Sequence, residues 1–155
     1  MNKVAFLIGS VSDKKTVEYS LEYFDYFNID AEIIVMSAHR NPNEVHKFAS
    51  NAKVNGYVTL ICGAGMSAHL AGAVKANTIL PVIGVPLPGG MMDGLDSLLS
   101  TVNMPKGVPV ATTSVGKAGA INAAILAAEI IALNDSEMTE KLVKFKQNGS
   151  TLSGL

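Results

Sequence analysis

Cysteine is almost absent from this sequence, which has 155 residues and a single cysteine, Cys62. Neither a disulfide framework nor a cysteine metal cluster can therefore form within the chain. Cys62 ends the short apolar run Val-Thr-Leu-Ile-Cys. A free cysteine in such a run is typical of a buried strand, so we predict a structural place in the core for Cys62.

Net charge is also nearly absent. The 12 Lys and Arg residues are balanced by 13 Asp and Glu residues, which leaves a formal net charge of -1. So small a charge creates no summed field that would attract nucleic acid or an anionic membrane, and we expect neither as a partner. Any binding of an anion must depend on a local arrangement of side chains.

Long uninterrupted apolar runs are missing too. A membrane-spanning helix needs about 18 or more apolar residues, and the longest candidate, residues 118–133, contains Asn122 and Glu129. The apolar run at residues 4–8 is too short for a secretory signal and leads directly into a turn. These absences predict a soluble, cytoplasmic protein.

Short apolar runs alternate with helix-length segments along the chain, which is typical of parallel strands joined by helical crossovers. The predicted strands are residues 4–8, 31–36, 57–62, 82–85 and 108–112. Apolar side chains recur at helical spacing in residues 13–27 and 43–55, which predicts amphipathic helices there. We therefore expect a single α/β domain whose five-stranded parallel sheet is covered on both faces.

Residues 118–133 are predicted to form a different kind of helix, apolar around nearly its whole circumference. Small residues such as Ala123 and Ala127 would allow another helix to approach closely. Because one small protomer can cover such a helix only in part, we expect a homo-oligomer to bury the remainder.

The end of the chain is predicted to lie outside the main unit. Residues 135–147 are rich in charged side chains, which favours a solvated helix, and the Gly- and Ser-containing residues 148–155 are expected to fray. This divides the chain into a main domain at residues 1–134 and a C-terminal helix and tail at residues 135–155.

Three loops with polar or glycine-rich residues each follow a predicted strand, at residues 9–13, 37–42 and 63–70. In an open parallel sheet, ligands bind at the carboxyl ends of the strands, near the point where the strand order reverses. If the order is flavodoxin-like, the first and third strands flank that point and the second lies beside the first. All three loops then meet in one cleft.

The first loop, Gly-Ser-Val-Ser-Asp, combines a flexible backbone with two hydroxyl groups at the start of a helix. Such a helix start favours a phosphate. An ordinary capped turn, in which Ser10 or Asp13 serves the helix, explains the same residues. Because a carboxylate is poorly suited to contact a phosphate, Asp13 would accept hydrogen bonds from ribose hydroxyls instead.

The second loop places His39 next to Arg40. Histidine titrates near neutral pH, and arginine is a fixed cation that can hold a phosphate through two contacts. Together they suit proton transfer on a phosphorylated substrate. The structural alternative is a loop histidine bonded to backbone beside a surface arginine. In the third loop, His69 could either cap a helix or line the cleft.

Several catalytic motifs are absent. The sequence contains no H-E-x-x-H, G-x-x-x-x-G-K-[ST] or G-x-S-x-G pattern, and no clustered set of metal-binding residues. A dinucleotide-binding G-x-G-x-x-G pattern is broken, because Ala68 stands where its third glycine would fall. The reaction class that stays open is acid–base rearrangement of a small phosphorylated molecule. Such a reaction would use neither a metal nor a covalent nucleophile.

Together, these loops resemble the PurE family, whose usual pattern joins G-S-x-S-D, S-A-H-R-x-P, G-A-G-x-x-A-H-L-x-G and M-P-x-G-x-P-V. The matching segments are residues 9–13, 37–42, 63–72 and 104–110, with further matches at 94–97 and 116–119. The resemblance covers about residues 4–131. Each motif is common by itself, whereas their joint order is specific.

The resemblance implies a three-layer, flavodoxin-like α/β protomer that assembles as a homo-octamer and needs no metal or organic cofactor. It also implies N5-carboxyaminoimidazole ribonucleotide mutase activity, in which a carboxylate moves from N5 to C4 of an aminoimidazole ribonucleotide. His39 would shuttle the proton. The other residues implied to bind this substrate are Ser10, Ser12, Asp13 and Arg40 around the ribose phosphate, and Ser37, Ala38, Gly63, Ala64, Gly65, Ala68, His69 and Leu70 around the imidazole and the migrating carboxyl group.

Two positions depart from the family pattern. Ala71 stands where the family usually has proline, and residues 88–92 replace a loop that more often carries Ser or Thr. Two other functions remain open: direct carboxylation of aminoimidazole ribonucleotide with free CO2, and a non-catalytic flavodoxin-like nucleotide-binding module. The segments 68–70 and 104–110 look more like the mutase class than the direct carboxylase.

Overall fold

All five strands of the sheet run parallel, in the order β2-β1-β3-β4-β5. The computed structural model describes residues 2–155. Its strands are β1 (Asn2–Ile8), β2 (Ile29–Val35), β3 (Tyr57–Ala64), β4 (Val82–Pro86) and β5 (Ala111–Thr112). The strand order reverses between β1 and β3, so the predicted five-stranded sheet and its flavodoxin-like order are confirmed.

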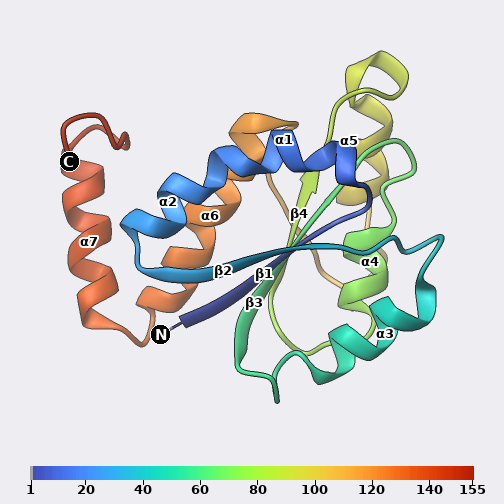
Figure 1. The fold of residues 1–155 in the computed structure, drawn as a ribbon, viewed down its shortest axis with the longest axis horizontal. Coiled ribbons are helices and arrows are strands. Elements are labelled where there is room, and N and C mark those ends of the chain that lie inside the picture. Colours follow the sequence, from blue (N-terminus) through green and yellow to red (C-terminus); the bar gives the residue numbers. More distant parts are fainter. Residues whose placement is uncertain (1) are drawn as a thin grey trace.

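Helices cover both faces of this sheet, which makes the fold a three-layer α/β sandwich (Figure 1). One side holds α1 (Lys14–Val17), α2 (Leu21–Tyr26) and α6 (Lys117–Ala132), with α7 (Ser136–Gln147) packed against α6. The other side holds α3 (Pro42–Asn51), α4 (Leu70–Lys75) and α5 (Leu95–Val102).

Strand β1 shows why the sequence of a central strand is continuously apolar. Val4, Phe6 and Ile8 point into the core on the α6 side, whereas Ala5 and Leu7 point into the core on the α3 side. All five are 0% exposed. Successive side chains of a strand face opposite sides, so covering both faces requires an apolar residue at every position. Cys62 of β3 is buried as predicted.

The helix predicted over residues 13–27 is interrupted. It consists of α1 and α2, with 3-10 turns at Val11–Asp13 and Glu18–Ser20. At the second turn, the buried hydroxyl of Ser20 donates a 2.6 Å hydrogen bond to the carbonyl of Val17. The expectation of one continuous helix was wrong because apolar spacing does not distinguish an α-helix from one with tighter turns.

Two further boundaries differ from the prediction. Helix α3 ends at Asn51, and turns follow as far as Gly56, whose φ of 85° suits glycine. Strand β5 has only two residues, because Pro109 in the predicted strand has no N–H to donate to a neighbour. Helix α5 had not been predicted.

The apolar helix is α6, and most of its surface is covered within the protomer. Five of its alanines face inward: Ala120, Ala123, Ala124, Ala127 and Ala128 are all 0% exposed. These small side chains let α6 lie close to the sheet and to α7. The alanine face therefore does not itself require a second copy, and the homo-oligomer stays a prediction. No helix within residues 2–155 is both long and apolar enough to cross a membrane.

Helix α7 is amphipathic, and only its outer face is solvated. Phe145 is 0% exposed, and its ring meets the rings of Phe27 and Tyr23 edge-on, at centroid distances of 5.6 and 6.2 Å. This is a favourable geometry for aromatic pairs. Helix α7 thus shares a core with earlier parts of the chain, and the division at residue 134 stays a prediction.

Replacing Phe145 by alanine should lower the free energy of unfolding by about 3–5 kcal/mol, as is usual when a buried aromatic ring is removed. Urea denaturation at one fixed protein concentration measures this loss. The control is Val143→Ala on the same helix, where the side chain is 49% exposed and the loss should stay below about 1 kcal/mol. Equally small losses in both variants would contradict the docking of α7 in the core.

Candidate active site

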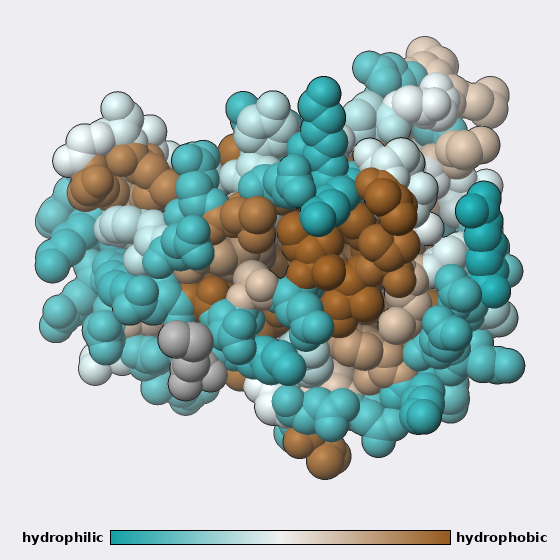
Figure 2. Space-filling view, viewed as in Figure 1, coloured by the Kyte–Doolittle hydropathy of each residue, from teal (hydrophilic) through white to brown (hydrophobic). Residues whose placement is uncertain are grey.

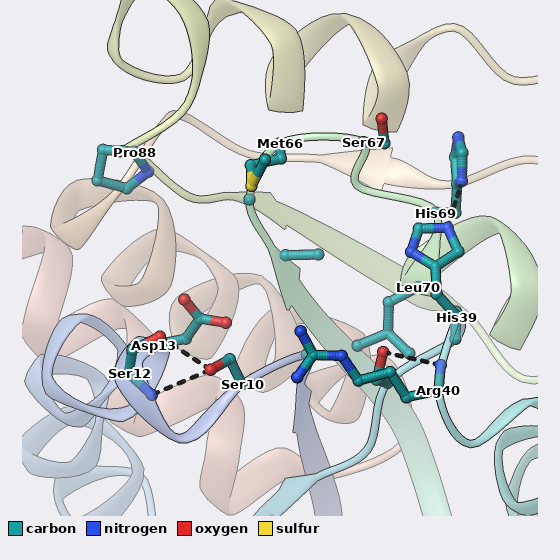
Figure 3. Close-up of a pocket in the computed structure, with 16 residues that line it drawn as sticks. Ser10, Ser12, Asp13, His39, Arg40, Met66, Ser67, His69, Leu70 and Pro88 are labelled. Atoms are coloured by element: carbon teal, nitrogen blue, oxygen red, sulfur yellow. Dashed lines mark hydrogen bonds between the residues drawn. The ribbon is translucent and has the colours of Figure 1, made fainter.

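A cavity of about 550 Å³ opens at the carboxyl ends of β1, β2, β3 and β4. This size is typical of a small-molecule site. Four loops line it, and Figure 3 shows side chains from several of them directed toward a common space. The lining residues are Gly9, Ser10, Ser12, Asp13, Ser37, Ala38, His39, Arg40, Ala64, Gly65, Met66, Ser67, His69, Leu70, Pro88 and Gly89.

All but two of the predicted site residues line this cavity. The exceptions are Gly63 and Ala68. A Cβ atom on Gly63 would lie 3.3 Å from the Phe6 ring, so this glycine allows close packing inside the sheet. Ala68 is 2% exposed, and its N–H donates a 2.9 Å hydrogen bond to Oγ of Ser100. Both residues are chain neighbours of lining residues and do not line the cavity themselves.

The loop after β1 combines a capped turn with a cavity surface. Ser10 accepts a 3.3 Å hydrogen bond from the N–H of Ser12, and their hydroxyls lie 2.9 Å apart. Ser10 therefore caps the 3-10 turn, whereas Asp13 makes no such capping bond to α1. Burial raises the pKa of the Asp13 carboxyl, and a hydrogen bond with the Ser10 backbone partly offsets this.

The loop after β2 is a compact turn closed by its own side chains. The N–H of Arg40 donates to Oγ of Ser37 at 3.2 Å, and the N–H of Ser37 donates to Oδ1 of Asn41 at 3.3 Å. These bonds leave the side chains of His39 and Arg40 exposed at the cavity. Within residues 2–155, Arg40 forms no ion pair, so its guanidinium is available to an anionic ligand.

The loop after β3 brings a second histidine to the first. Nε2 of His39 and Nδ1 of His69 lie 2.7 Å apart, within hydrogen-bonding distance, and Figure 3 shows the two rings directed toward one another. Although His69 precedes α4, its side chain makes no capping bond to that helix. Of the two expectations for His69, lining the cleft is therefore the correct one.

Sequence reasoning did not assign five lining residues to the site: Gly9, Met66, Ser67, Pro88 and Gly89. Three belong to loops that had been singled out. The other two come from the loop after β4, which is held by a 3.1 Å bond from the N–H of Gly89 to Oδ1 of Asp93. Its position after a central strand was the signal that could have identified it.

No group of three His, Cys, Asp or Glu side chains in residues 2–155 has the arrangement of a metal site. The side chains at the cavity can instead accept and donate protons, attract an anion and form hydrogen bonds to hydroxyl groups. Such a set suits acid–base chemistry on a small anionic molecule.

The chain is similar to several known proteins over nearly its whole length. A protein-family model described as AIR carboxylase matches residues 3–151. The N5-carboxyaminoimidazole ribonucleotide mutase of Escherichia coli strain K12 is 46% identical over 140 residues, which are 90% of this chain and 83% of that protein. The Bacillus subtilis enzyme of the same name is also 46% identical, over 94% of this chain and 90% of its own.

A solved structure supports the same relationship. The crystal structure of Treponema denticola PurE matches with a TM-score of 0.87 at 27% sequence identity. The match covers 97% of this chain and 92% of that chain.

Asp13→Asn should raise the melting temperature near pH 7. Because burial raises the pKa of Asp13, the folded protein binds a proton more tightly than the unfolded chain, whose carboxyl has a pKa of about 3.9. Stability therefore falls as pH rises from the pKa of the unfolded chain to the higher pKa of the folded protein. Above both values the ionised carboxylate destabilises the fold. The gain in melting temperature of Asp13→Asn should vanish below about pH 3.9, where Asp13 is protonated in both states.

Melting curves from pH 3 to pH 8 test this expectation. Asp25→Asn, at an exposed position on α2, is the matched control and should show no such pH-dependent gain. A loss of stability in Asp13→Asn at pH 7 would mean that the carboxylate stabilises the loop.

Proposed function

Because the chain belongs to the AIR carboxylase family, we propose that it is an N5-carboxyaminoimidazole ribonucleotide mutase of de novo purine biosynthesis. It converts its substrate to 4-carboxy-5-aminoimidazole ribonucleotide. Beyond the relatives' names, the main support is one cavity that contains a histidine, an arginine with no ion pair in residues 2–155, and a wall of small residues.

In this proposal, the phosphate and ribose of the substrate bind between the loops after β1 and β2. Arg40 attracts the phosphate and can contact two of its oxygens. The hydroxyls of Ser10 and Ser12 donate hydrogen bonds to the same group, and Ser37 adds a third hydroxyl at the cavity. Asp13 accepts hydrogen bonds from ribose hydroxyls, because a carboxylate would repel the phosphate.

The base and its carboxyl group then lie toward the loop after β3. Ala38, Ala64, Gly65 and Leu70 line this side of the cavity with small or apolar groups. Such a wall allows close approach of a planar ring and keeps water away from CO2. No side chain in this wall competes as a nucleophile for the CO2.

His39 acts as both acid and base. In the first half-reaction the N5–carboxyl bond breaks, CO2 departs, and N5 keeps the electron pair and takes a proton from the His39 imidazolium. In the second, C4 of aminoimidazole ribonucleotide attacks CO2, and neutral His39 removes the proton from C4. One proton cycles between His39 and substrate with no net gain, so a single acid–base residue suffices for both half-reactions.

The first alternative is direct carboxylation of aminoimidazole ribonucleotide by free CO2. The family description fits either reaction, but relatives at 43–46% identity are named as mutases. Incubation with each substrate separates the two. The mutase consumes N5-carboxyaminoimidazole ribonucleotide without added bicarbonate, whereas a direct carboxylase leaves that substrate unchanged. A non-catalytic nucleotide-binding module would convert neither.

We also propose that the protein is a homo-octamer and that it acts in the cytoplasm, where nucleotide precursors are made. Apolar surface supports association with further copies. Figure 2 shows apolar side chains gathered over the edge strand β2, where Val35 is 47% exposed. On α5, Leu95, Leu99 and Val102 are 40%, 55% and 50% exposed at helical spacing. Exposed apolar patches of this kind often mark interfaces.

His39→Asn should reduce kcat by about 10²-fold or more, the usual contribution of an acid–base group. The amide keeps much of the size and polarity of the imidazole but cannot exchange a proton, so the dissociation constant of the substrate should change little. Rate assays and calorimetry measure the two quantities. Activity within about tenfold of wild type would remove His39 from the catalytic role.

Arg40→Ala should weaken binding of the ribonucleotide by about tenfold to a hundredfold, the usual effect of losing a hydrogen bond to a charged group. Binding of the riboside, which has no phosphate, should change far less. Calorimetry with both ligands measures the difference, and Lys47→Ala, at an exposed position on α3 outside the cavity, is the control. Equal losses for the two ligands would contradict a phosphate-binding role.

A further inference from the structure

The two histidines of the cavity form a pair that the single-histidine mechanism does not use. Nε2 of His39 and Nδ1 of His69 are 2.7 Å apart, and the rings stand nearly perpendicular, with an interplanar angle of 86° and a centroid distance of 4.9 Å. His39 comes from the loop after β2 and His69 from the residue before α4. The contact therefore joins two loops 30 residues apart in the chain.

A hydrogen bond between two imidazole nitrogens has room for one proton. Either Nε2–H of His39 donates to Nδ1 of His69, or the reverse. In both cases Nε2 of His39 is occupied, which leaves Nδ1 as its free ring nitrogen. If His39 is the donor, this Nδ1 has a lone pair and can accept a proton. If His69 is the donor, His39 carries its hydrogen on Nδ1 and, while neutral, cannot act as a base there.

Resting on the proposed mutase function, we propose that His69 is a positioning residue. It accepts the hydrogen bond from Nε2–H of His39 and so keeps the working lone pair of neutral His39 on Nδ1. This is the role of the third group that orients the base in other acid–base sites. It differs from direct contact between His69 and the substrate.

The pair keeps the proton balance of the reaction. At the start, the His39 imidazolium holds hydrogens on both nitrogens, and Nδ1–H gives its proton to N5 as the N5–carboxyl bond breaks. The neutral ring keeps Nε2–H bonded to His69. After C4 has attacked CO2, Nδ1 takes the proton from C4 and the imidazolium is restored. His69 neither gains nor loses a proton, and its accepting nitrogen stabilises the cationic form of His39.

Two substitutions at His69 separate hydrogen bonding from packing. His69→Phe keeps a flat ring but has no acceptor, whereas His69→Asn has an amide oxygen near the position of Nδ1. We expect His69→Phe to lower kcat by up to about 10²-fold and His69→Asn to restore it to within about tenfold of wild type, with little change of KM in either. If His69 had a purely structural role, His69→Phe would keep more activity than His69→Asn, because the phenyl ring preserves the packing. If His69 contacted the substrate, both variants would mainly raise KM. Either pattern overturns the proposal.

His46 provides a matched control outside the cavity. Its Nδ1 lies 2.7 Å from Oδ1 of Asn77, a contact of the same length between α3 and the turn after α4. His46→Phe removes a similar hydrogen bond and should leave kcat unchanged. A loss as large as that of His69→Phe would show that the assay reports general damage to the fold, and the inference would lose its kinetic support.

The tautomer of His39 can be observed without turnover. Nitrogen-15 NMR of histidine-labelled protein, at a pH where both rings are neutral, should show the hydrogen of His39 on Nε2 in wild type and a mixture of tautomers in His69→Phe. A hydrogen on Nδ1 in wild type would overturn the inference. Should the wild-type protein fail to convert N5-carboxyaminoimidazole ribonucleotide, the proposed function falls while this measurement still decides the pairing.

Discussion

Hydrogen bonding between parallel strands continues past their ends, and the site depends on it. The N–H of Met36 donates to the carbonyl of Ile8 at 2.8 Å, that of Gly9 to Gly63 at 3.2 Å, and that of Leu87 to Ala64 at 2.9 Å. These bonds link the ends of β1, β2, β3 and β4 in one register. Because all the strands are parallel, their carboxyl ends meet at one edge of the sheet, and so do the loops that follow.

The scaffold beneath this edge is made rigid by close packing of small residues. A Cβ atom on Gly119 would lie 1.7 Å from the carbonyl oxygen of Ser114, and one on Gly84 would lie 2.5 Å from the Thr101 side chain. Together with the alanines of α6, these glycines let helices and loops lie against the sheet with little space between them. A core packed in this way holds loop residues in fixed positions, as proton transfer between groups about 3 Å apart requires.

The cavity itself contains features that do not favour stability. Asp13 is partly buried, which raises its pKa, and Met66 has a left-handed backbone with φ of 53°. Arg40 lacks an ion pair within the described chain. The protein leaves the hydrogen-bonding and charge requirements of such polar groups unmet. A polar ligand can meet them when it binds. The rigid sheet offsets these local costs.

Much of the fold was predictable because strands that are buried on both faces have continuous apolar runs in the sequence. The apolar runs of β1, β3 and β4 identified a parallel sheet, and the loops after its strands identified most cavity residues, including Ser10, His39 and Arg40. Less regular features escaped prediction. The 3-10 turn at Ser20 and the short β5 depend on single hydrogen bonds or their absence, which apolar spacing does not report.

Which side chains are available at the carboxyl edge of the sheet can be read from the local sequence, because strand period and loop position are local properties. Which of these side chains meet depends on the tertiary structure. The contact between His39 and His69 joins residues 30 positions apart, and the inward direction of the α6 alanines depends on how that helix docks. Both follow from the relative placement of whole elements, which apolar periodicity does not specify.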